Sequence, residues 1–254
     1  MLTRAGADGR RGRDSMNDLA KRTIAAHGGI DAWRRHKSVH AHLVQGGALW
    51  KLKANGAQIA DVDVTVATDR QWVSHAPFGA TSLRSSFSKD RVAIESVDDR
   101  VVEELLTPRA SFAGHQLSTP WTDLQLAFFV GCAMWTYLNV PFVLAWPEVE
   151  SEDAGIWRER GESWQRLIVH YPPELEVFSK KQTLYLGEDG LLRRMDYNIE
   201  IAGDTPGAHY VHDYVEVAGI KFPTRRRIYP RQADGSSLSE PLVVSIDLDA
   251  IELF

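Results

Sequence analysis

The chain has 254 residues, of which 44% are hydrophobic and 25% are charged, and its formal net charge at pH 7 is -5. This length suffices for one large β-rich domain or two small ones, and the acidic balance argues against a nucleic-acid partner. The single cysteine, Cys132, excludes an internal disulfide framework and a multi-cysteine zinc site.

Residues 1–15 combine arginine, aspartate and glycine and contain no apolar stretch. A secretory signal needs such a stretch, so we predict a disordered leader over 1–15 and one domain over 16–254. Met1 and Met16 are alternative start residues. With no signal recognised, we expect a cytoplasmic location.

The N-terminal third begins as a helix and continues as strands. Asn17–Trp33 carries a partial apolar stripe that Gly28 and Gly29 interrupt. From Ser38 to Glu95 apolar and polar residues alternate, which is typical of half-buried strands. Within this region we predict a strand at Leu49–Leu52 and a hairpin turn at Asn55–Gly56. Asp98–Leu106 is predicted to form a short helix that ends before Pro108.

The longest apolar run, Trp121–Phe142, is predicted to be a central helix. Thr119 is its expected cap, Pro120 suits the first helical position, and Pro141 ends it. Its apolar core of roughly 15 residues is shorter than the ~20 that span a bilayer, so no membrane span is expected. A helix that is apolar all round is buried all round, by core packing or by lining a ligand cavity. The expected wall residues are Trp121, Phe128, Phe129, Trp135 and Tyr137.

Strand patterns return after this helix and continue to the C-terminus. We expect residues 148–153 to form a solvated acidic loop, followed by strands at 156–158, 164–170, 180–186, 191–201, 208–217, 220–229 and 242–253. Turn signals every 8–12 residues indicate an all-β architecture. The fold class is therefore mainly β (α+β): a curved antiparallel sheet of about ten or eleven strands forms an incomplete barrel. One central apolar helix and one or two short capping helices complete it.

Three motifs resemble the half-barrel superfamily of periplasmic lipoprotein carriers and related lipid-binding lipoproteins. They are Ala25-Ala26-His27-Gly28-Gly29-Ile30-Asp31-Ala32-Trp33, Gly190-Leu191-Leu192-Arg193-Arg194 and Val217-Ala218-Gly219-Ile220-Lys221-Phe222-Pro223. The resemblance spans Asn17 to Phe254. It implies an open barrel closed by helices, with a hydrophobic cavity for acyl chains.

Polar residues near the predicted cavity suggest acid–base chemistry or head-group recognition. If the two strands pair, Tyr197 or Asp196 neighbours His209 or Tyr210 as an acid–base pair, and the alternative is ordinary cross-strand stabilisation. His115 lies in the loop that enters the central helix, where cavity rims are usual. Ser111, His115 and Asp123 do not match a known triad spacing.

Arginines alternate along the strand at Arg225, Arg226 and Arg227. On a cavity face they would bind a carboxylate or phosphate head group, and we name Arg225 and Arg227 as ligand-binding candidates. His40, His42, His209 and His212 could supply metal ligands, but nothing in the sequence brings their strands together. We therefore predict no metal and no cofactor.

Two functions are compatible with these features. The preferred one is a soluble binding protein that encloses a hydrophobic small molecule or lipid. The alternative is a cofactor-independent enzyme, of cyclase or isomerase type, acting on an apolar biosynthetic intermediate in the same cavity. A third is a structural protein without a ligand. The sequence leaves the oligomeric state open.

Overall fold

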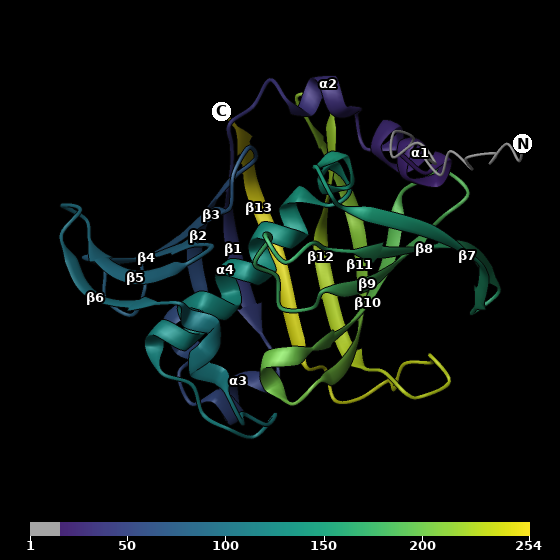
Figure 1. Ribbon diagram of the computed structural model, residues 1–254. Coiled ribbons are helices and arrows are strands. Elements are labelled where there is room, and N and C mark those ends of the chain that lie inside the picture. Colours follow the sequence, from purple (N-terminus) through teal and green to yellow (C-terminus); the bar gives the residue numbers. More distant parts are fainter. Residues whose placement is uncertain (1–15) are drawn as a thin grey trace, which may run out of the picture.

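One curved antiparallel sheet dominates the computed structural model, which describes residues 16–254 (Figure 1). The leader predicted for residues 1–15 lies outside the described residues. The sheet has 13 strands in the order β6-β5-β4-β3-β2-β1-β13-β12-β11-β10-β9-β8-β7. The strands are β1 (Ser38–Gly46), β2 (Asp61–Ala67), β3 (Trp72–Ala76), β4 (Leu83–Ser88), β5 (Arg91–Ser96), β6 (Val101–Leu106), β7 (Glu150–Glu159), β8 (Glu162–His170), β9 (Lys181–Leu186), β10 (Leu192–Ile199), β11 (Thr205–Val217), β12 (Ile220–Pro230) and β13 (Val244–Leu253).

The helices are few and mostly short. The α-helices are α1 (Asp18–Ala26), α2 (Ile30–Trp33), α3 (Leu49–Lys53) and α4 (Asp123–Asn139). The 3₁₀ helices are η1 (Gly56–Ile59), η2 (Pro108–Phe112), η3 (Phe142–Ala145) and η4 (Glu200–Ala202). α1 begins at an Asn17 cap, whose side chain accepts hydrogen bonds from the main-chain N–H groups of Leu19 and Ala20.

The sheet consists of two meanders that meet in the middle. Strands β1–β6 form one and β7–β13 form the other, and β1 pairs with β13 from Val39↔Leu253 to Gly46↔Ser245. The chain must therefore return from the β6 edge to the β7 edge. α4 makes this return across the concave side of the sheet (Figure 1), which places the most apolar segment of the chain inside the curve.

Alternation along the strands separates the two faces of the sheet. In β1, Val39, Ala41 and Leu43 are buried in the hydrophobic core, whereas His40 and His42 lie on the outer face. On the outer face, Nδ1 of His42 lies 3.2 Å from Oδ1 of Asp63, and this hydrogen bond raises the pKa of His42. The inner residues of the other strands join one continuous hydrophobic core with α4.

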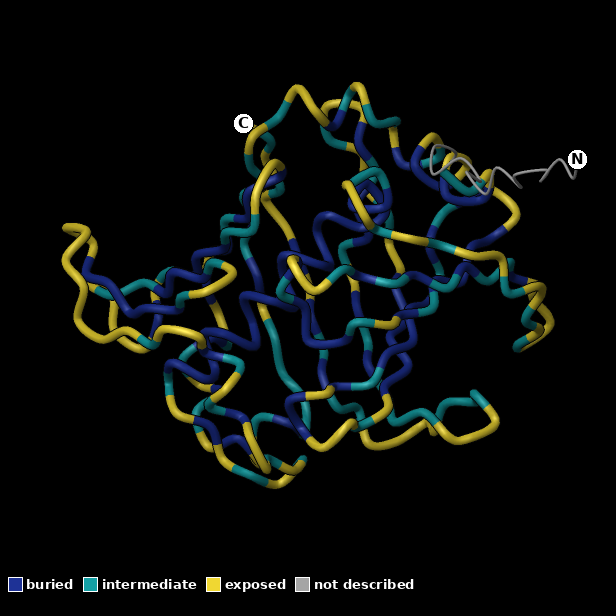
Figure 2. The backbone as a smooth tube through the Cα atoms, viewed as in Figure 1, coloured by how far each residue is buried: buried dark blue, intermediate teal, exposed yellow. Residues whose placement is uncertain are grey.

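α4 is buried along nearly its whole length (Figure 2). All residues from Leu124 to Asn139 are buried, as expected for a helix without a polar face. Its cap is Thr122 in a capping box with Gln125, not Thr119. It ends at Asn139, two residues before Pro141, as predicted. α4 has 17 residues, and within 16–254 no helix combines the length and hydropathy needed to cross a membrane.

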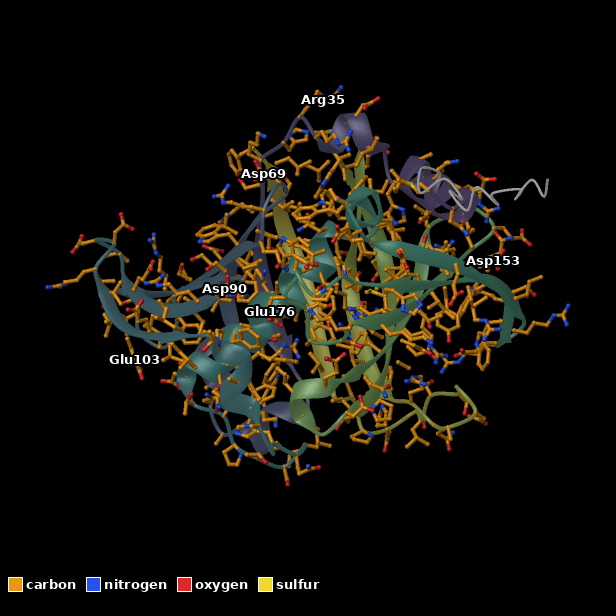
Figure 3. All side chains as sticks on the ribbon, viewed as in Figure 1. Arg35, Asp69, Asp90, Glu103, Asp153 and Glu176 are labelled. Carbon is orange, nitrogen blue, oxygen red and sulfur yellow. The ribbon has the colours of Figure 1, made fainter. Side chains whose placement is uncertain are left out.

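Several sequence-based assignments are corrected by the tertiary structure. The sheet has 13 strands, not ten or eleven. Asp98–Leu106 is not a helix, because Val101–Leu106 pairs with β5 as the edge strand β6. The acidic residues after Glu148 are not a loop, because Glu150–Asp153 belongs to the other edge strand, β7. Charged side chains are common on edge strands, and Figure 3 shows Glu103 and Asp153 on these opposite edges.

The predicted hairpin at Asn55–Gly56 is also wrong. Leu49–Lys53 forms α3 and Gly56–Ile59 forms η1. The two short helices cover the end of the barrel below α4 and bury Leu49 and Ile59. An alternating pattern four residues long does not distinguish a strand from a single helical turn, and here packing against the barrel end decides.

Candidate functional site

A narrow apolar crevice lies between α4 and the inner face of β12 and β13. The open space in it is about 30 Å³. Its lining residues are Gln45, Leu49, Trp50, Phe129, Val130, Ala133, Met134, Tyr137, Tyr197, Ile199, Ile228, Val243, Val244 and Ile246. We call this set the apolar crevice. It is the place where an apolar molecule would contact α4 and the sheet together.

The helical repeat explains the α4 side of the apolar crevice. Phe129, Ala133 and Tyr137 follow one another at intervals of four residues and so lie on one face of the helix. Met134 adds a flexible thioether chain beside them, and methionine readily changes shape to fill or vacate space. The present volume would hold only about one methylene-sized group, so a longer chain would enter by displacing side chains such as Met134.

A buried polar cluster lies at the inner end of the apolar crevice. The hydroxyl groups of Tyr137 and Tyr197 are 2.8 Å apart. The Tyr197 hydroxyl is 3.4 Å from Nδ1 of His209, and the Tyr137 and His209 rings make an edge contact with centroids 4.5 Å apart. We call Tyr137, Tyr197, His209 and Arg226 the inner cluster. The β10–β11 register Met195↔His209 places His209 on the same face as Tyr197.

Arg226 of β12 is the charged member of the inner cluster. It is 1% exposed, and its Nη2 donates to the main-chain carbonyl oxygen of Tyr137 at 2.8 Å. Its guanidinium carbon lies 5.2 Å from the centroid of the Tyr137 ring. Among residues 16–254, neither Nε nor Nη1 of Arg226 has a hydrogen-bond partner, and Nε2 of His209 has none either. The cluster therefore retains hydrogen-bonding capacity in an otherwise apolar interior.

Burial controls the ionisation of the inner cluster. It raises the pKa of Tyr137 to about 12 and raises the pKa of Tyr197 well above its ordinary value. Burial, followed by the charge of Arg226, lowers the pKa of His209 well below its usual range. Burial also lowers the pKa of Arg226 to about 10, so the guanidinium stays charged at neutral pH. A neutral imidazole and two neutral phenols are poor proton-transfer groups near pH 7, so the cluster suits hydrogen bonding to a ligand.

The five predicted wall residues separate into two groups. Phe129 and Tyr137 line the apolar crevice. Phe128 packs against Phe87 with ring centroids 5.8 Å apart, and Trp135 donates through Nε1 to the carbonyl oxygen of Arg70 at 2.9 Å. These contacts, like those of Trp121 with Phe112 and Phe129, belong to the core. One helix cannot present all its faces to one cavity.

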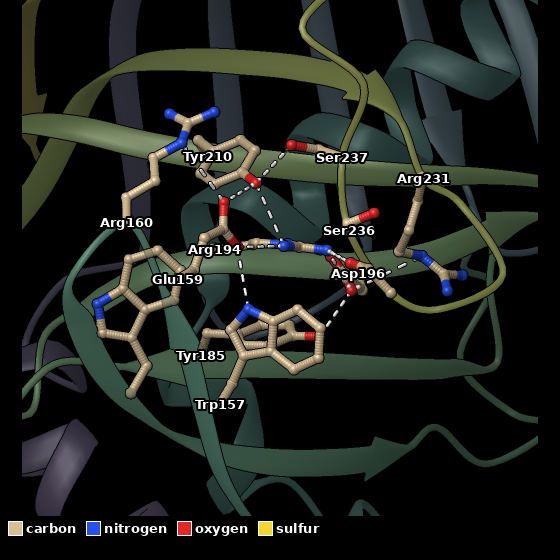
Figure 4. Close-up of polar contacts among 12 residues, drawn as sticks. Trp157, Glu159, Arg160, Tyr185, Arg194, Asp196, Tyr210, Arg231, Ser236 and Ser237 are labelled. Atoms are coloured by element: carbon tan, nitrogen blue, oxygen red, sulfur yellow. Dashed lines mark hydrogen bonds and ion pairs between the residues drawn. The ribbon is translucent and has the colours of Figure 1, made fainter.

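The five acid–base candidates do not meet in one place. Tyr197 and His209 point inward, whereas their sequence neighbours Asp196 and Tyr210 point outward. On the outer face both contact Arg194, which is fully buried and binds Asp196 through Nε and Nη2 at 2.7 and 2.8 Å (Figure 4). Tyr210 donates to Glu159 at 2.5 Å. Asp196 and Tyr210 are thus held in a closed network of hydrogen bonds.

His115 lies apart from both groups. Its ring makes an edge contact with Phe112, with centroids 5.4 Å apart, in the segment before α4. Its Nδ1 is buried and has no hydrogen-bond partner among the described residues. It contacts neither the apolar crevice nor the inner cluster.

Arg225 and Arg227 point to the outer face, so neither reaches the apolar crevice. Arg226, between them, points inward. The parity of β12 carries this information, because Ile220, Phe222 and Ile228 are even-numbered apolar positions and all are buried. Arg226 is at an even-numbered position, as these apolar residues are, and this shared parity predicts that its charge faces inward.

A groove of about 500 Å³ lies on the outer face of β8–β10. Its four carboxylates already accept hydrogen bonds within the protein: Asp196 from Arg194, Glu200 from Arg109, Asp204 from the amide of Asn198, and Asp234 from Ser236. Within residues 16–254, no group of three or more His, Cys, Asp or Glu residues could hold a metal ion. We therefore place the candidate site at the apolar crevice.

Comparison with known proteins identifies the fold. No protein-family model and no curated protein matches this sequence. Three solved structures share the fold. A DUF1329 family protein from Desulfovibrio piger has 12% sequence identity and a TM-score of 0.54, over 93% of this chain and 94% of that chain. A Vibrio parahaemolyticus domain named for outer membrane lipoprotein sorting has 10% identity and a TM-score of 0.52, over 93% of this chain and 91% of that chain. A LolA superfamily protein from Nitrosomonas europaea has 10% identity and a TM-score of 0.51, over 95% of this chain and 94% of that chain. The half-barrel resemblance expected from the sequence is confirmed.

The expected cytoplasmic location is corrected by the same comparison. The Vibrio parahaemolyticus domain is named for sorting at the outer membrane. This neighbour speaks against the cytoplasmic location expected from the sequence. The sequence-based expectation came from the absence of a recognisable signal in residues 1–15.

Proposed function

We propose that this half-barrel, which shares the LolA superfamily fold, binds an amphipathic molecule with its apolar chain in the apolar crevice and its polar end at the inner cluster. The observation that carries the proposal is the juxtaposition of an almost wholly apolar lining with Tyr137, Tyr197 and Arg226 at its inner end. Sites of this kind bind through apolar walls and orient the ligand by a few polar groups.

Two features support an acyl chain or similar hydrophobic molecule as the ligand. The fold neighbours include a domain named for lipoprotein sorting, and the wall of the apolar crevice is built from aliphatic and aromatic side chains on both sides. Each buried methylene contributes about 0.8 kcal/mol, so a chain of several methylenes would offset the cost of moving Met134 and its neighbours.

The enzyme alternative has less support. Tyr197 and His209 are both neutral at pH 7, because burial raises the pKa of Tyr197 and lowers the pKa of His209. Asp196 and Tyr210 are fully engaged on the outer face. No pair of the candidate residues combines proximity with a pKa suited to proton transfer at pH 7.

A binding experiment with a matched control tests the proposal. The probe is a fluorescent polyene fatty acid, titrated into the purified protein. Ala133→Leu places three extra carbons in the apolar crevice and is expected to weaken binding by roughly tenfold or more. Ala113→Leu makes the same change at an exposed position before α4 and should leave binding unchanged.

A second variant tests the effect of enlarging the apolar crevice. Met134→Ala removes a flexible side chain from the wall and should preserve or strengthen binding of the polyene fatty acid. Circular dichroism on each variant checks that the fold is retained. Equal binding by wild type and a folded Ala133→Leu variant would overturn the proposal, as would the absence of any binding to the wild type.

A further inference from the structure

A basic cleft lies on the outer face of the sheet, on the opposite side from the apolar crevice. Its volume is about 330 Å³. The residues that line it are Arg160, Tyr210, His212, Asp213, Arg225, Arg227, Tyr229, Leu238 and Ser239. We call it the outer cleft. It is independent of the proposed function, because the sheet separates it from the inner cluster.

Strand register brings the basic side chains together. In the β11–β12 ladder, Tyr210 is paired with Arg227 and His212 with Arg225, so all four lie on one face. Arg160 reaches them from the turn between β7 and β8. Its guanidinium carbon lies 5.5 Å from the centroid of the Tyr210 ring, and Figure 4 shows it against that ring. Residues distant in the sequence thus converge on one cleft.

Two of the three arginines are only loosely paired with carboxylates. Nη1 of Arg225 is 3.7 Å from Oδ2 of Asp213, and Nε of Arg160 is 3.8 Å from Oε1 of Glu159. Both distances exceed that of a hydrogen bond. Glu159 is moreover bound to Arg194 at 2.6 Å. The N–H groups of Arg160 and Arg225 therefore remain available to a ligand.

Arg227 is the anchored member of the set. It binds the two carboxylate oxygens of Asp247 at 2.8 and 3.0 Å. The pKa of His212 is lowered first by burial, and the charges of Arg225, Arg227 and Arg160 lower it further against the opposing effect of Asp213. The three guanidinium groups therefore all lie close enough to His212 to act on its charge, and its imidazole is neutral at pH 7.

We propose that the outer cleft binds a phosphate group through Arg160, Arg225 and His212. Arginine presents a planar fork of N–H donors that matches phosphate oxygens, and the neutral imidazole can donate one further hydrogen bond. The cleft is larger than a phosphate ion, and Leu238 and the Tyr229 ring provide walls for the group that carries the phosphate. That group comes from a phosphorylated small molecule or from a phospholipid head group.

Two probes distinguish these sources. Inorganic phosphate is titrated into the full chain and followed by calorimetry and by the NMR signal of the His212 ring. In parallel, the protein is sedimented with phosphatidylcholine vesicles that contain phosphatidylglycerol, and with vesicles of phosphatidylcholine alone. Saturable phosphate binding that raises the pKa of His212 indicates a small phosphorylated ligand. Selective sedimentation with the anionic vesicles indicates a lipid head group.

A charge-matched control separates the outer cleft from the overall charge of the protein. Arg160→Gln/Arg225→Gln removes the two loosely held cations, and both side chains are exposed, so folding should not suffer. Arg34→Gln/Arg35→Gln makes the same net change at the far end of the molecule, where Figure 3 labels Arg35. The first variant should lose binding by roughly tenfold or more, and the second should bind as the wild type does.

Two results would overturn the assignment. One is a wild-type protein that binds neither inorganic phosphate nor anionic vesicles. The other is an equal loss of binding in both double variants, because the effect would then come from net charge alone. Neither result would affect the fatty-acid titration of the apolar crevice, so the two proposals fail separately.

Discussion

Arg226 supplies the hydrogen bond that Tyr137 lacks within its own helix. The carbonyl oxygen of Tyr137 would normally accept from the N–H of residue 141, but Pro141 has no N–H. Nη2 of Arg226 donates to this oxygen at 2.8 Å instead. A cation also suits the C-terminal end of α4, where the helix dipole is negative. The contact joins α4 to β12 in the centre of the half-barrel.

Replacing Arg226 should therefore destabilise the protein, because the carbonyl oxygen of Tyr137 would lose its hydrogen-bond donor. Arg226→Met removes the buried charge but leaves the Tyr137 oxygen unpaired in the core, which costs about 1–3 kcal/mol. Urea unfolding measures the change. The exposed variant Arg225→Gln is the control and should stay within about 0.5 kcal/mol of the wild type. An unchanged midpoint for Arg226→Met would show that the contact does not stabilise α4.

Close packing of α4 on β4 predicts an intolerant glycine. A Cβ atom added to Gly131 would lie 2.4 Å from Cγ of Phe87. Gly131→Ala is therefore expected to destabilise the fold by about 1–3 kcal/mol through overpacking, despite the higher helix propensity of alanine.

A second substitution tests whether the Phe87 ring is the cause. Phe87→Leu in the Gly131→Ala background should recover part of the loss, because it removes the ring that the new methyl group meets. The coupling energy comes from thermal or urea unfolding of the two single variants and the double variant. Purely additive effects would locate the strain elsewhere.

The buried His27 predicts a pH-dependent stability. Its Nδ1 lies 2.8 Å from the Thr23 carbonyl oxygen, and burial lowers its pKa from 6.5 to about 4. The unfolded chain therefore binds a proton that the native state excludes between those pH values. Stability is complete above pH 6.5, falls as the pH decreases toward 4, and loses about 3 kcal/mol from this group.

The variant His27→Gln isolates this contribution from those of the other buried histidines. Urea unfolding between roughly pH 4 and 6.5 should show a shallower dependence of the unfolding free energy on pH, by up to about one proton. Parallel pH profiles for the variant and the wild type would mean that His27 titrates equally in both states.

The outer network around Arg194 makes a different prediction. Arg194→Met would leave Asp196, which is 6% exposed, without its hydrogen-bonded cationic partner, and only the Nε of Arg231, 3.6 Å from Oδ2, would remain near it. Breaking a buried ion pair in this way costs about 3–5 kcal/mol. The double variant Arg194→Met/Asp196→Leu removes both charges of this pair and should recover part of the loss, because Glu159 also loses Arg194 but keeps its hydrogen bonds from Trp157 and Tyr210. Thermal unfolding checks the order, and a double variant less stable than Arg194→Met would contradict it.

The network around Arg194 depends on contacts between residues that are far apart in the sequence. Arg194 receives support from Glu159 of β7, from Tyr210 of β11 and from the carbonyl oxygen of Gly235 in the loop after β12. The sequence suggested only that Asp196 and Tyr210 could be neighbours. It gave no indication that Arg194 joins them, because a strand at 156–158 does not by itself show that Glu159 lies beside Arg194.

Local patterns in the sequence determined the general architecture. Alternation with frequent turns identified the antiparallel sheet, and an apolar run without a polar face identified α4 as buried. The end of α4 before Pro141 also follows from local chemistry, because proline cannot continue the hydrogen-bond ladder. These features depend on residues a few positions apart.

Tertiary structure alone decided which side chains share a site. Side chains alternate with a period of two, so a shift of one residue moves a group to the other face of the sheet. Tyr197 and His209 therefore meet inside, while Asp196 and Tyr210 lie outside. The closing pair of β1 with β13, the curvature of the sheet and the path of α4 fix these faces, and they depend on contacts across the whole chain.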